Sequence, residues 1–161
     1  YLFRSGAGET VKLIESEGGK ALDIHCRLPQ TNPVYEKAWK RLWKSMDDLI
    51  LLSIMQVSAT IKTLFEATVE EWRECLDINL TGEYIVCREA ARVMIENNFK
   101  GSMVNIASMS GHIVNVPQCQ AAYNASKAGV IHMTKSLAIE WIDKIFVLIL
   151  SARDMSQLQC L

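Results

Sequence analysis

The chain carries almost no net charge and has no apolar segment long enough to cross a membrane. Its 161 residues include 17 basic and 18 acidic side chains, so no electrostatic field attracts nucleic acid or acidic lipid. The longest apolar run, residues 145–150, is far shorter than the roughly 20 residues that span a bilayer. No signal or transit segment is visible. We therefore expect a cytoplasmic protein with no nucleic-acid partner and no membrane partner.

Patterns typical of metal sites and disulfide frameworks are also missing. The five cysteines are odd in number, scattered and without C-x-x-C spacing, which favours reduced thiols. The three histidines lie too far apart in sequence to suggest a metal motif, and we expect no metal. Half of the residues are hydrophobic, which suits one domain with a substantial core over residues 1–161.

What the chain does contain is a strand followed by a helix, both with reactive side chains. Residues 102–111 read Ser-Met-Val-Asn-Ile-Ala-Ser-Met-Ser-Gly, and their apolar centre is typical of a strand buried on both faces. Ser108 and Ser110 mark the end of that strand, where ligands bind in open α/β sheets. A helical pattern follows after a loop. Tyr123 and Lys127 lie four residues apart and therefore share one face of that helix.

This pair suits proton transfer to or from an alcohol oxygen. A tyrosine titrates near pH ~10 in water, which is too high for a base at neutral pH. An ammonium group one helical turn away, or a nicotinamide cation, favours the phenolate and makes the transfer feasible. A serine hydroxyl at the neighbouring strand end can hold the same oxygen and polarise it. By itself, Y-x-x-x-K is also compatible with an ordinary surface helix.

The strand V-N-I-A-S followed by Tyr-Asn-Ala-Ser-Lys resembles the short-chain dehydrogenase/reductases, in wording most like NADP-dependent sugar and polyol reductases. The resemblance implies a catalytic set in which Tyr123 supplies the proton, Lys127 assists it and holds the cofactor ribose, and a serine orients the carbonyl. Asn79-Leu-Thr-Gly82 implies that Asn79 is the fourth catalytic residue, whose backbone holds a water beside the lysine. An asparagine in a kinked helix is the alternative for Asn79. The resemblance also implies a homo-oligomer.

Two serines compete for the carbonyl-orienting position. The interval to Tyr123 favours Ser110, because the serine of the resembled family precedes the tyrosine by slightly fewer residues than Ser108 does. The match at the strand end and at Gly111 favours Ser108. The strand end is the better reference for aligning the serine, because the length of the loop before Tyr123 can vary. Ser108 is therefore the prediction and Ser110 the alternative.

The sequence supports cofactor binding at Arg4 and argues against it at residues 53–59. The resemblance places Arg4 at the end of the second strand, where an arginine without an acid suits a 2′-phosphate, and hence NADP over NAD. A solvated turn arginine is the alternative. Asn79, Tyr123 and Lys127 would complete the cofactor contacts. Residues 53–59 replace the family's Asn-Asn-Ala-Gly-like turn and contain no glycine that would let the backbone approach a ligand closely.

The resemblance implies an α/β fold with a Rossmann-like, doubly wound parallel sheet in the strand order 3-2-1-4-5-6. Matched to that order, the chain lacks strand one with its glycine-rich loop, and the C-terminal lid is not recognisable, so the sheet is predicted to be incomplete. With strand one missing, we expect the isolated chain to aggregate or stay partly unfolded and to bind no dinucleotide. The predicted strands are residues 1–3, 22–26, 49–52, 103–107 and 145–150.

Predicted helices separate these strands. Thr68 and Glu71 have capping-box spacing and open a helix whose apolar face includes Trp72. A second apolar stripe at helical spacing begins at Leu80 and runs on to Asn97. Two further helices are predicted over residues 9–17 and about 34–46.

Two functions fit this sequence. The first is an NADP-dependent oxidoreductase that interconverts a ketone, in particular a ketose, and a secondary alcohol, a polyol. The second is a non-enzymatic, shortened relative that cannot bind the dinucleotide and acts at most through subunit association. The intact Asn-Ser-Tyr-Lys set favours the first function, whereas the missing phosphate loop and the altered turn favour the second. Titration of NADPH fluorescence with the chain distinguishes them.

Overall fold

The structure is a computed structural model that describes residues 6–19, 51–54, 59, 61–98, 101–144 and 146–150. Contacts group the chain into two compact units, residues 1–47 and 48–161. In the first unit the structure describes helix α1 (Gly6–Ser16) and the turn after it. Gly18 in this turn has a φ of 83°, a left-handed conformation that commonly follows a helix end. The helix predicted over residues 9–17 is thereby confirmed.

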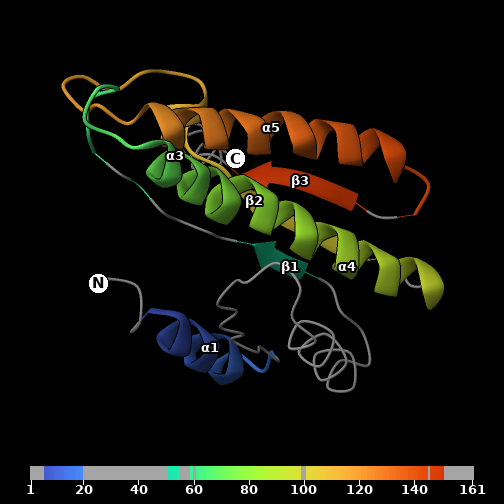
Figure 1. Ribbon diagram of the computed structural model, residues 1–161. Helices are drawn as coiled ribbons and strands as arrows, with labels where there is room; N and C mark the ends of the chain where they lie inside the picture. Colours follow the sequence, from blue (N-terminus) through green and yellow to red (C-terminus); the bar gives the residue numbers. More distant parts are fainter. Residues whose placement is uncertain are drawn as a thin grey trace. The chain divides into compact units, whose positions relative to one another are not determined.

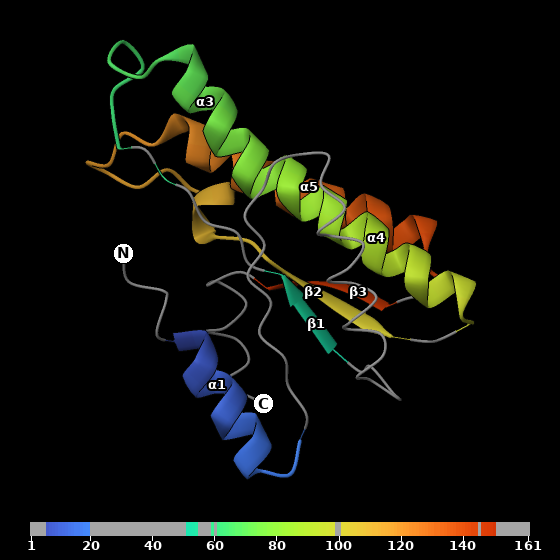
Figure 2. The same cartoon turned by 60° about the horizontal axis from the view of Figure 1, so that its bottom comes forward.

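The second unit is built on a parallel sheet. Its described strands are β1 (Leu51–Ile54), β2 (Ser102–Ile106) and β3 (Phe146–Leu150), and β2 lies between the other two. Both pairs are parallel, and Val104 of β2 pairs with Ser53 on one side and Leu148 on the other. Figure 2 shows the three strands side by side. Parallel neighbours require long crossover connections, which helices supply here.

One helical run lies in the crossover from β1 to β2. It comprises α3 (Val69–Leu76), the π-helical segment η1 (Asp77–Thr81) and α4 (Gly82–Glu96). The predicted capping box begins it: the Glu71 N–H donates to Thr68 Oγ1 over 3.1 Å, and the Thr68 N–H donates to the Glu71 carboxylate over 2.9 Å. The sequence predicts one helix from Thr68 and another from Leu80. The structure joins them through a π-helical turn, a feature frequent at functional sites.

Helix α5 (Ala121–Glu140) lies in the crossover from β2 to β3. Figures 1 and 2 show α4 and α5 side by side on one face of the sheet. A buried polar chain joins these elements. The Cys87 thiol of α4 donates to Asn105 Oδ1 of β2 over 3.2 Å, and Asn105 Nδ2 donates to Thr134 Oγ1 of α5 over 2.9 Å. Because all three side chains are buried, this chain fixes how the two helices sit on β2.

The predicted α/β class with parallel strands is confirmed in the second unit. The strands predicted at 49–52, 103–107 and 145–150 are present, with boundaries displaced by one or two residues. The predictions for residues 1–3, 22–26 and 34–46 lie outside the described residues. The missing strand one and the single domain over residues 1–161 stay predictions. No helix in the part of the chain described here is long and apolar enough to cross a membrane.

Candidate active site

Ser108 lies just beyond β2, at the carboxyl edge of the sheet. Its backbone is extended, with φ −151° and ψ 153°, and it caps the single 3₁₀ turn η2 (Met109–Gly111). The Ser110 N–H donates to Ser108 Oγ over 3.2 Å. The Ser108 side chain is partly exposed, so its hydroxyl is accessible at the edge where parallel sheets bind ligands.

Ser110 has a different environment two residues later. Its side chain is 5% exposed, and its Oγ accepts hydrogen bonds from Asn115 Nδ2 over 3.1 Å and from Gln120 Nε2 over 3.2 Å. Two amides from the following loop therefore converge on this hydroxyl. This arrangement favours Ser108 as the hydroxyl that binds a substrate. The hydrogen bonds to Ser110 instead hold the loop before α5 in place.

Helix α5 brings Lys127 to the end of β2. Lys127 Nζ donates to the Ile106 carbonyl over 2.9 Å, and the lysine is 1% exposed. Tyr123 lies one turn earlier on the same helix and is partly buried. Ile106 is the last residue of β2, two positions before Ser108. The structure thus places the predicted lysine against the strand end that presents the predicted serine.

Asn79 lies in the π-helical segment and is fully buried. Its Nδ2 donates to Ser126 Oγ over 3.1 Å and contacts Cys75 Sγ at 3.4 Å. The Ser126 hydroxyl in turn donates to the Tyr123 carbonyl over 2.7 Å. Asn79 is therefore connected through one serine to the main chain of the helix that bears Tyr123 and Lys127. In the predicted catalytic set, Ser108 lies between β2 and η2, Asn79 on η1, and Tyr123 and Lys127 on α5, which packs against both η1 and η2.

Glu83 is a charged residue of this site that the sequence analysis missed. It lies one turn after Asn79 and one turn before Cys87, on the buried face of the helical run. Its side chain is 0% exposed, and its Oε2 lies 3.9 Å from Lys127 Nζ. The signal was present in the sequence, because an acidic residue at helical spacing inside an otherwise buried stripe needs a partner.

Burial is the main cause of the pKa shifts of Glu83 and Lys127. It raises the pKa of Glu83 to about 8, although the Lys127 ammonium acts in the opposite direction. It also lowers the pKa of Lys127, and the neighbouring Glu83 carboxylate partly offsets that effect. At neutral pH the Glu83 carboxyl therefore keeps its proton.

The turn η2 packs directly on the backbone of α5. A Cβ built on Gly111 would lie 2.8 Å from the Lys127 carbonyl carbon and 2.9 Å from the Ala128 nitrogen. These distances are shorter than real Cβ contacts, so only glycine permits this approach. The close contact fixes the distance between the strand end with Ser108 and the helix with Lys127.

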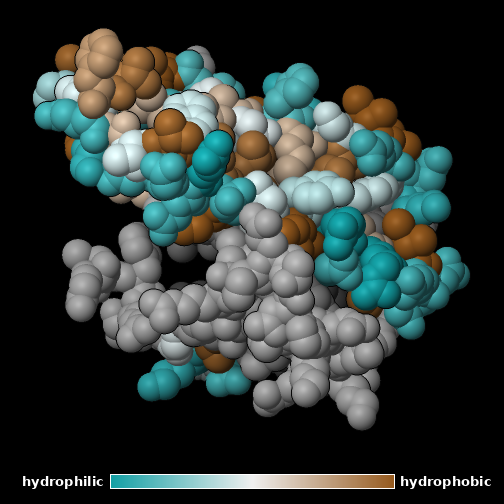
Figure 3. Space-filling view, viewed as in Figure 1, coloured by the Kyte–Doolittle hydropathy of each residue, from teal (hydrophilic) through white to brown (hydrophobic). Residues whose placement is uncertain are grey.

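Two loops flank the start of α5, and both carry exposed apolar side chains. The Lys62 N–H donates to the Cys119 carbonyl over 2.9 Å, which joins the loop before α3 to the loop before α5. Figure 3 shows hydrophobic surface gathered at this end of the second unit, at the upper left of the view. The surface beside the N-terminal turns of α5 is therefore apolar. Its most exposed members are Leu64, Phe65, Val114 and Val116.

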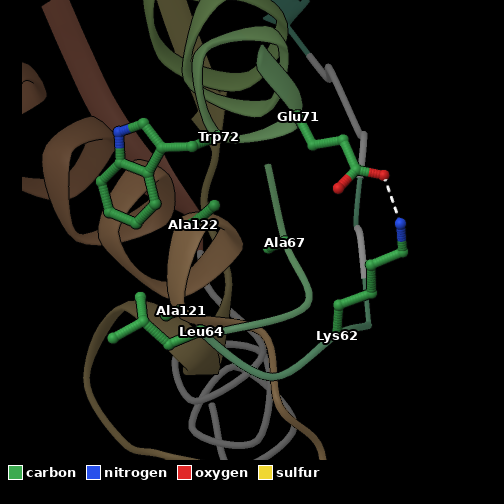
Figure 4. Close-up of a pocket in the computed structure, with 7 residues that line it drawn as sticks. All are labelled: Lys62, Leu64, Ala67, Glu71, Trp72, Ala121 and Ala122. Carbon is green, nitrogen blue, oxygen red and sulfur yellow. Dashed lines mark hydrogen bonds and ion pairs between the residues drawn. The ribbon is translucent and has the colours of Figure 1, made fainter. Parts of the chain in front are cut away.

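A small pocket lies beside α5. Figure 4 shows Lys62 and Glu71 on one side of it, where their ion pair spans 2.5 Å, and Trp72 on another. Its volume is about 30 Å³, which is room for about one or two water molecules. A sugar does not fit there. The lining residues are Lys62, Leu64, Ala67, Glu71, Trp72, Ala121 and Ala122.

The thiols and possible metal ligands form no separate centre in the described part of the chain. Cys75 and Cys87 are buried thiols, and Cys119 is an exposed one. Burial raises the pKa of Cys87 to about 12, so this thiol stays protonated while it donates to Asn105. Among the residues with described positions, no three His, Cys, Asp or Glu side chains are grouped to hold a metal ion.

Comparison with known proteins decides the family. The sequence profile of the short chain dehydrogenases matches residues 4–152 of this chain. The chain belongs to the short chain dehydrogenase family. Its parallel sheet is therefore part of a Rossmann-like dehydrogenase fold.

Several dehydrogenases are similar to this family member. An NADP-dependent mannitol dehydrogenase of Alternaria alternata is 49% identical over 80 residues, which is 50% of this chain and 30% of the relative. A ribulose-forming D-arabinitol 2-dehydrogenase of Scheffersomyces stipitis is 53% identical over 66 residues, 41% of this chain and 24% of the relative. The solved acetoin dehydrogenase of Salmonella typhimurium superposes with a TM-score of 0.77 at 28% identity, covering 94% of this chain and 62% of that one. The chain spans less than two thirds of each.

Two cofactor predictions lie largely beyond what the structure describes. Arg4 is outside the described residues, so its contact with a 2′-phosphate stays a prediction. Of the altered turn at residues 53–59, the structure describes only positions 53, 54 and 59.

Proposed function

We propose that this short chain dehydrogenase is an NADP-dependent oxidoreductase that interconverts a ketose and a polyol. The hydrogen bond from Lys127 to the Ile106 carbonyl carries the proposal, because it holds the lysine at the strand end beside Ser108. Tyr123 lies one turn away on the same helix. A hydroxyl donor, a phenol and a cation at one edge of a parallel sheet are the groups that carbonyl reduction needs.

The described residues fit the nicotinamide–ribose end of a dinucleotide. Lys127 supplies a cation at the carboxyl edge of the sheet, where dinucleotides bind in this fold. In the proposal, Lys127 and Tyr123 bind the ribose, Asn79 supports the lysine from the π-helical segment, and Arg4 binds the 2′-phosphate. The dinucleotide, when bound, supplies or accepts the hydride.

The side chains of the chain perform the proton chemistry. Tyr123 gives its phenolic proton to the carbonyl oxygen during reduction and takes a proton from the hydroxyl during oxidation. The Ser108 hydroxyl donates a hydrogen bond to the same oxygen and so orients the carbonyl. Lys127 keeps a positive charge one helical turn from the phenol. Asn79 steadies this helix through Ser126.

The names of similar relatives support the choice of cofactor and substrate. One relative is a mannitol dehydrogenase described as NADP-dependent, and another forms ribulose from D-arabinitol. Both substrates are polyols whose oxidation gives ketoses. The proposal extends to a cytoplasmic homo-oligomer, in which the exposed apolar side chains beside α5 would be covered by substrate or by a second subunit.

The first test is NADPH binding by the 161-residue chain, followed by its fluorescence, together with NADPH oxidation in the presence of fructose or ribulose. Acetoin serves as a ketone that is not a sugar. Turnover with ketoses and little turnover with acetoin are expected of a form that binds NADPH, whereas the isolated 161-residue chain is expected to bind none if strand one is missing. Failure to bind NADPH would support the alternative, a relative that acts only through subunit association. Equal use of NADH would contradict the NADP assignment.

The second test is Tyr123→Phe in a form of the protein that turns over. Removal of a general acid typically costs about 10²–10⁴-fold in rate. We expect a loss of this size with an NADPH dissociation constant changed by less than about twofold, because Lys127 and the remaining ribose contacts are kept. Turnover close to that of the unmodified protein would refute the catalytic assignment.

A further inference from the structure

Glu83 is a buried acid that the proposed chemistry does not use. Its side chain is 0% exposed, and Lys127, opposite it, is 1% exposed. Within the described residues neither Glu83 oxygen has a hydrogen-bond partner, and the 3.9 Å between Oε2 and Lys127 Nζ is an ion-pair distance, too long for a hydrogen bond. A buried carboxyl without hydrogen bonds is costly, and a glutamine or an apolar residue would fill similar space at lower cost.

Among the residues with described positions, Lys127 is the charged group that faces Glu83. On its own helix Glu83 acts electrostatically on Cys87, one turn later, and from α3 Cys75 acts electrostatically on Lys127. Burial raises the pKa of both thiols, so they are neutral at physiological pH. Strand β2 contributes the Ile106 carbonyl, which accepts from Lys127.

We propose that Glu83 is a positioning residue for Lys127, which holds the lysine Nζ from the side of α4 and determines how tightly the lysine keeps its proton. When Glu83 is ionised, its attraction adds to that of the Ile106 carbonyl and keeps the ammonium in the core. When Glu83 is protonated, that attraction disappears and the ammonium can turn toward a ligand. The inference rests on the proposed function only for the role of Lys127 at the cofactor.

The test measures the proton affinity of Lys127 without requiring turnover. Lysine labelled with ¹³C and ¹⁵N is incorporated, and the side-chain resonances are followed by NMR from pH 5 to pH 11. Lys127→Arg identifies the resonance by its loss. In the unmodified chain we expect two steps in the Lys127 curve, one near pH 8 from Glu83 and a later one from the lysine itself.

Glu83→Gln is the decisive variant, because it keeps the shape and removes the charge. We expect the step near pH 8 to vanish and the midpoint of the Lys127 titration to fall by at least about one pH unit, a tenfold loss of proton affinity. Glu96→Gln is the matched control on the same helix, where the carboxylate is exposed and pairs with Arg92. The Lys127 curve of this control should match that of the unmodified chain.

Several outcomes would overturn the proposal. One is a Lys127 curve in Glu83→Gln that superposes on that of the unmodified chain, and another is an equal change in Glu96→Gln. If Glu83→Gln does not fold, the unmodified chain still decides, because a Lys127 curve with no step from a neighbouring acid contradicts the pairing. A chain that shows the two-step curve but binds no NADPH refutes the proposed function and retains the Glu83–Lys127 pair, so the two failures are distinguishable.

Discussion

At the scale of single residues, two serines that look alike in sequence have different surroundings. Ser108 is partly exposed at the end of β2, whereas the Ser110 hydroxyl accepts two amide hydrogen bonds in a nearly closed environment. Counting residues back from the tyrosine cannot separate them, because the intervening loop has no fixed length. The hydrogen bonds of the two serines distinguish them. We therefore expect the alanine variants to affect different properties, activity at Ser108 and stability at Ser110.

Ser108→Ala is expected to lose activity while keeping stability. The variant removes a donor to the carbonyl oxygen, and loss of one such donor costs about 10²–10³-fold in turnover. Ser110→Ala is expected to do the reverse, because it removes the acceptor of the Asn115 amide and one of the two acceptors of the Gln120 amide, at about 1–3 kcal/mol. Steady-state kinetics and urea unfolding of both variants provide the comparison. The larger loss of turnover in Ser110→Ala would reverse the assignment.

At the scale of elements, the site depends on how closely η2 approaches α5. The two segments touch at Gly111, where an added Cβ would lie 2.6 Å from Ile131 Cδ1 and within 2.9 Å of main-chain atoms of Lys127 and Ala128. Backbone atoms cannot move aside as a side chain can. An added Cβ at Gly111 must therefore push α5 away from the strand end, which increases the distance between Lys127 and Ser108.

Gly111→Ala is expected to destabilise the protein by about 1–3 kcal/mol, as overpacking in a close contact does. Gly129→Ala is the matched control: its Cβ would lie 2.8 Å from Leu80 Cδ2, the end of a flexible side chain, and alanine favours a helix by up to about 1 kcal/mol over glycine. Thermal unfolding of both variants measures the difference. Equal melting temperatures would contradict the close backbone contact.

At the scale of the whole molecule, the buried acid makes stability depend on pH. Burial raises the pKa of Glu83 from 4.5 to about 8 in the folded protein. The folded state thus keeps a proton that the unfolded state has lost, so the contribution is complete below pH 4.5 and is lost as the pH rises toward 8. Burial lowers the pKa of Lys127 from 10.5, so the contribution of the lysine rises again only at more alkaline pH.

The free energy of unfolding is therefore expected to fall between about pH 5 and pH 8, by an amount on the order of a few kcal/mol. Glu83→Gln should match the unmodified protein near pH 5 and be more stable at pH 8, because the amide never ionises. Urea unfolding followed by tryptophan fluorescence at several pH values tests this, with Glu96→Gln as the control. A parallel pH dependence in Glu83→Gln would show that other groups cause the effect.

Several elements of this protein follow from interactions between residues that are close in sequence. The capping box at Thr68 and Glu71, the helix with Tyr123 and Lys127 on one face, and the apolar strand before Ser108 depend on neighbours within a few residues. Such patterns act through the backbone and the helical repeat, so they appear in the chain before any tertiary contact is known. For the same reason the family could be recognised from the sequence and a catalytic set could be proposed.

Only the tertiary structure decided which side chains are enclosed. Trp72 was predicted to face inward and is 37% exposed, whereas Glu83, a charged residue, is completely buried. The environment of Ser110 depends on the loop that supplies its hydrogen-bond donors. The environment of Glu83 depends on Lys127, a residue of another helix. These contacts join residues far apart in the chain, and burial depends on the packing of whole elements. Hydrophobicity and spacing within one segment carry no information about which distant group will lie opposite.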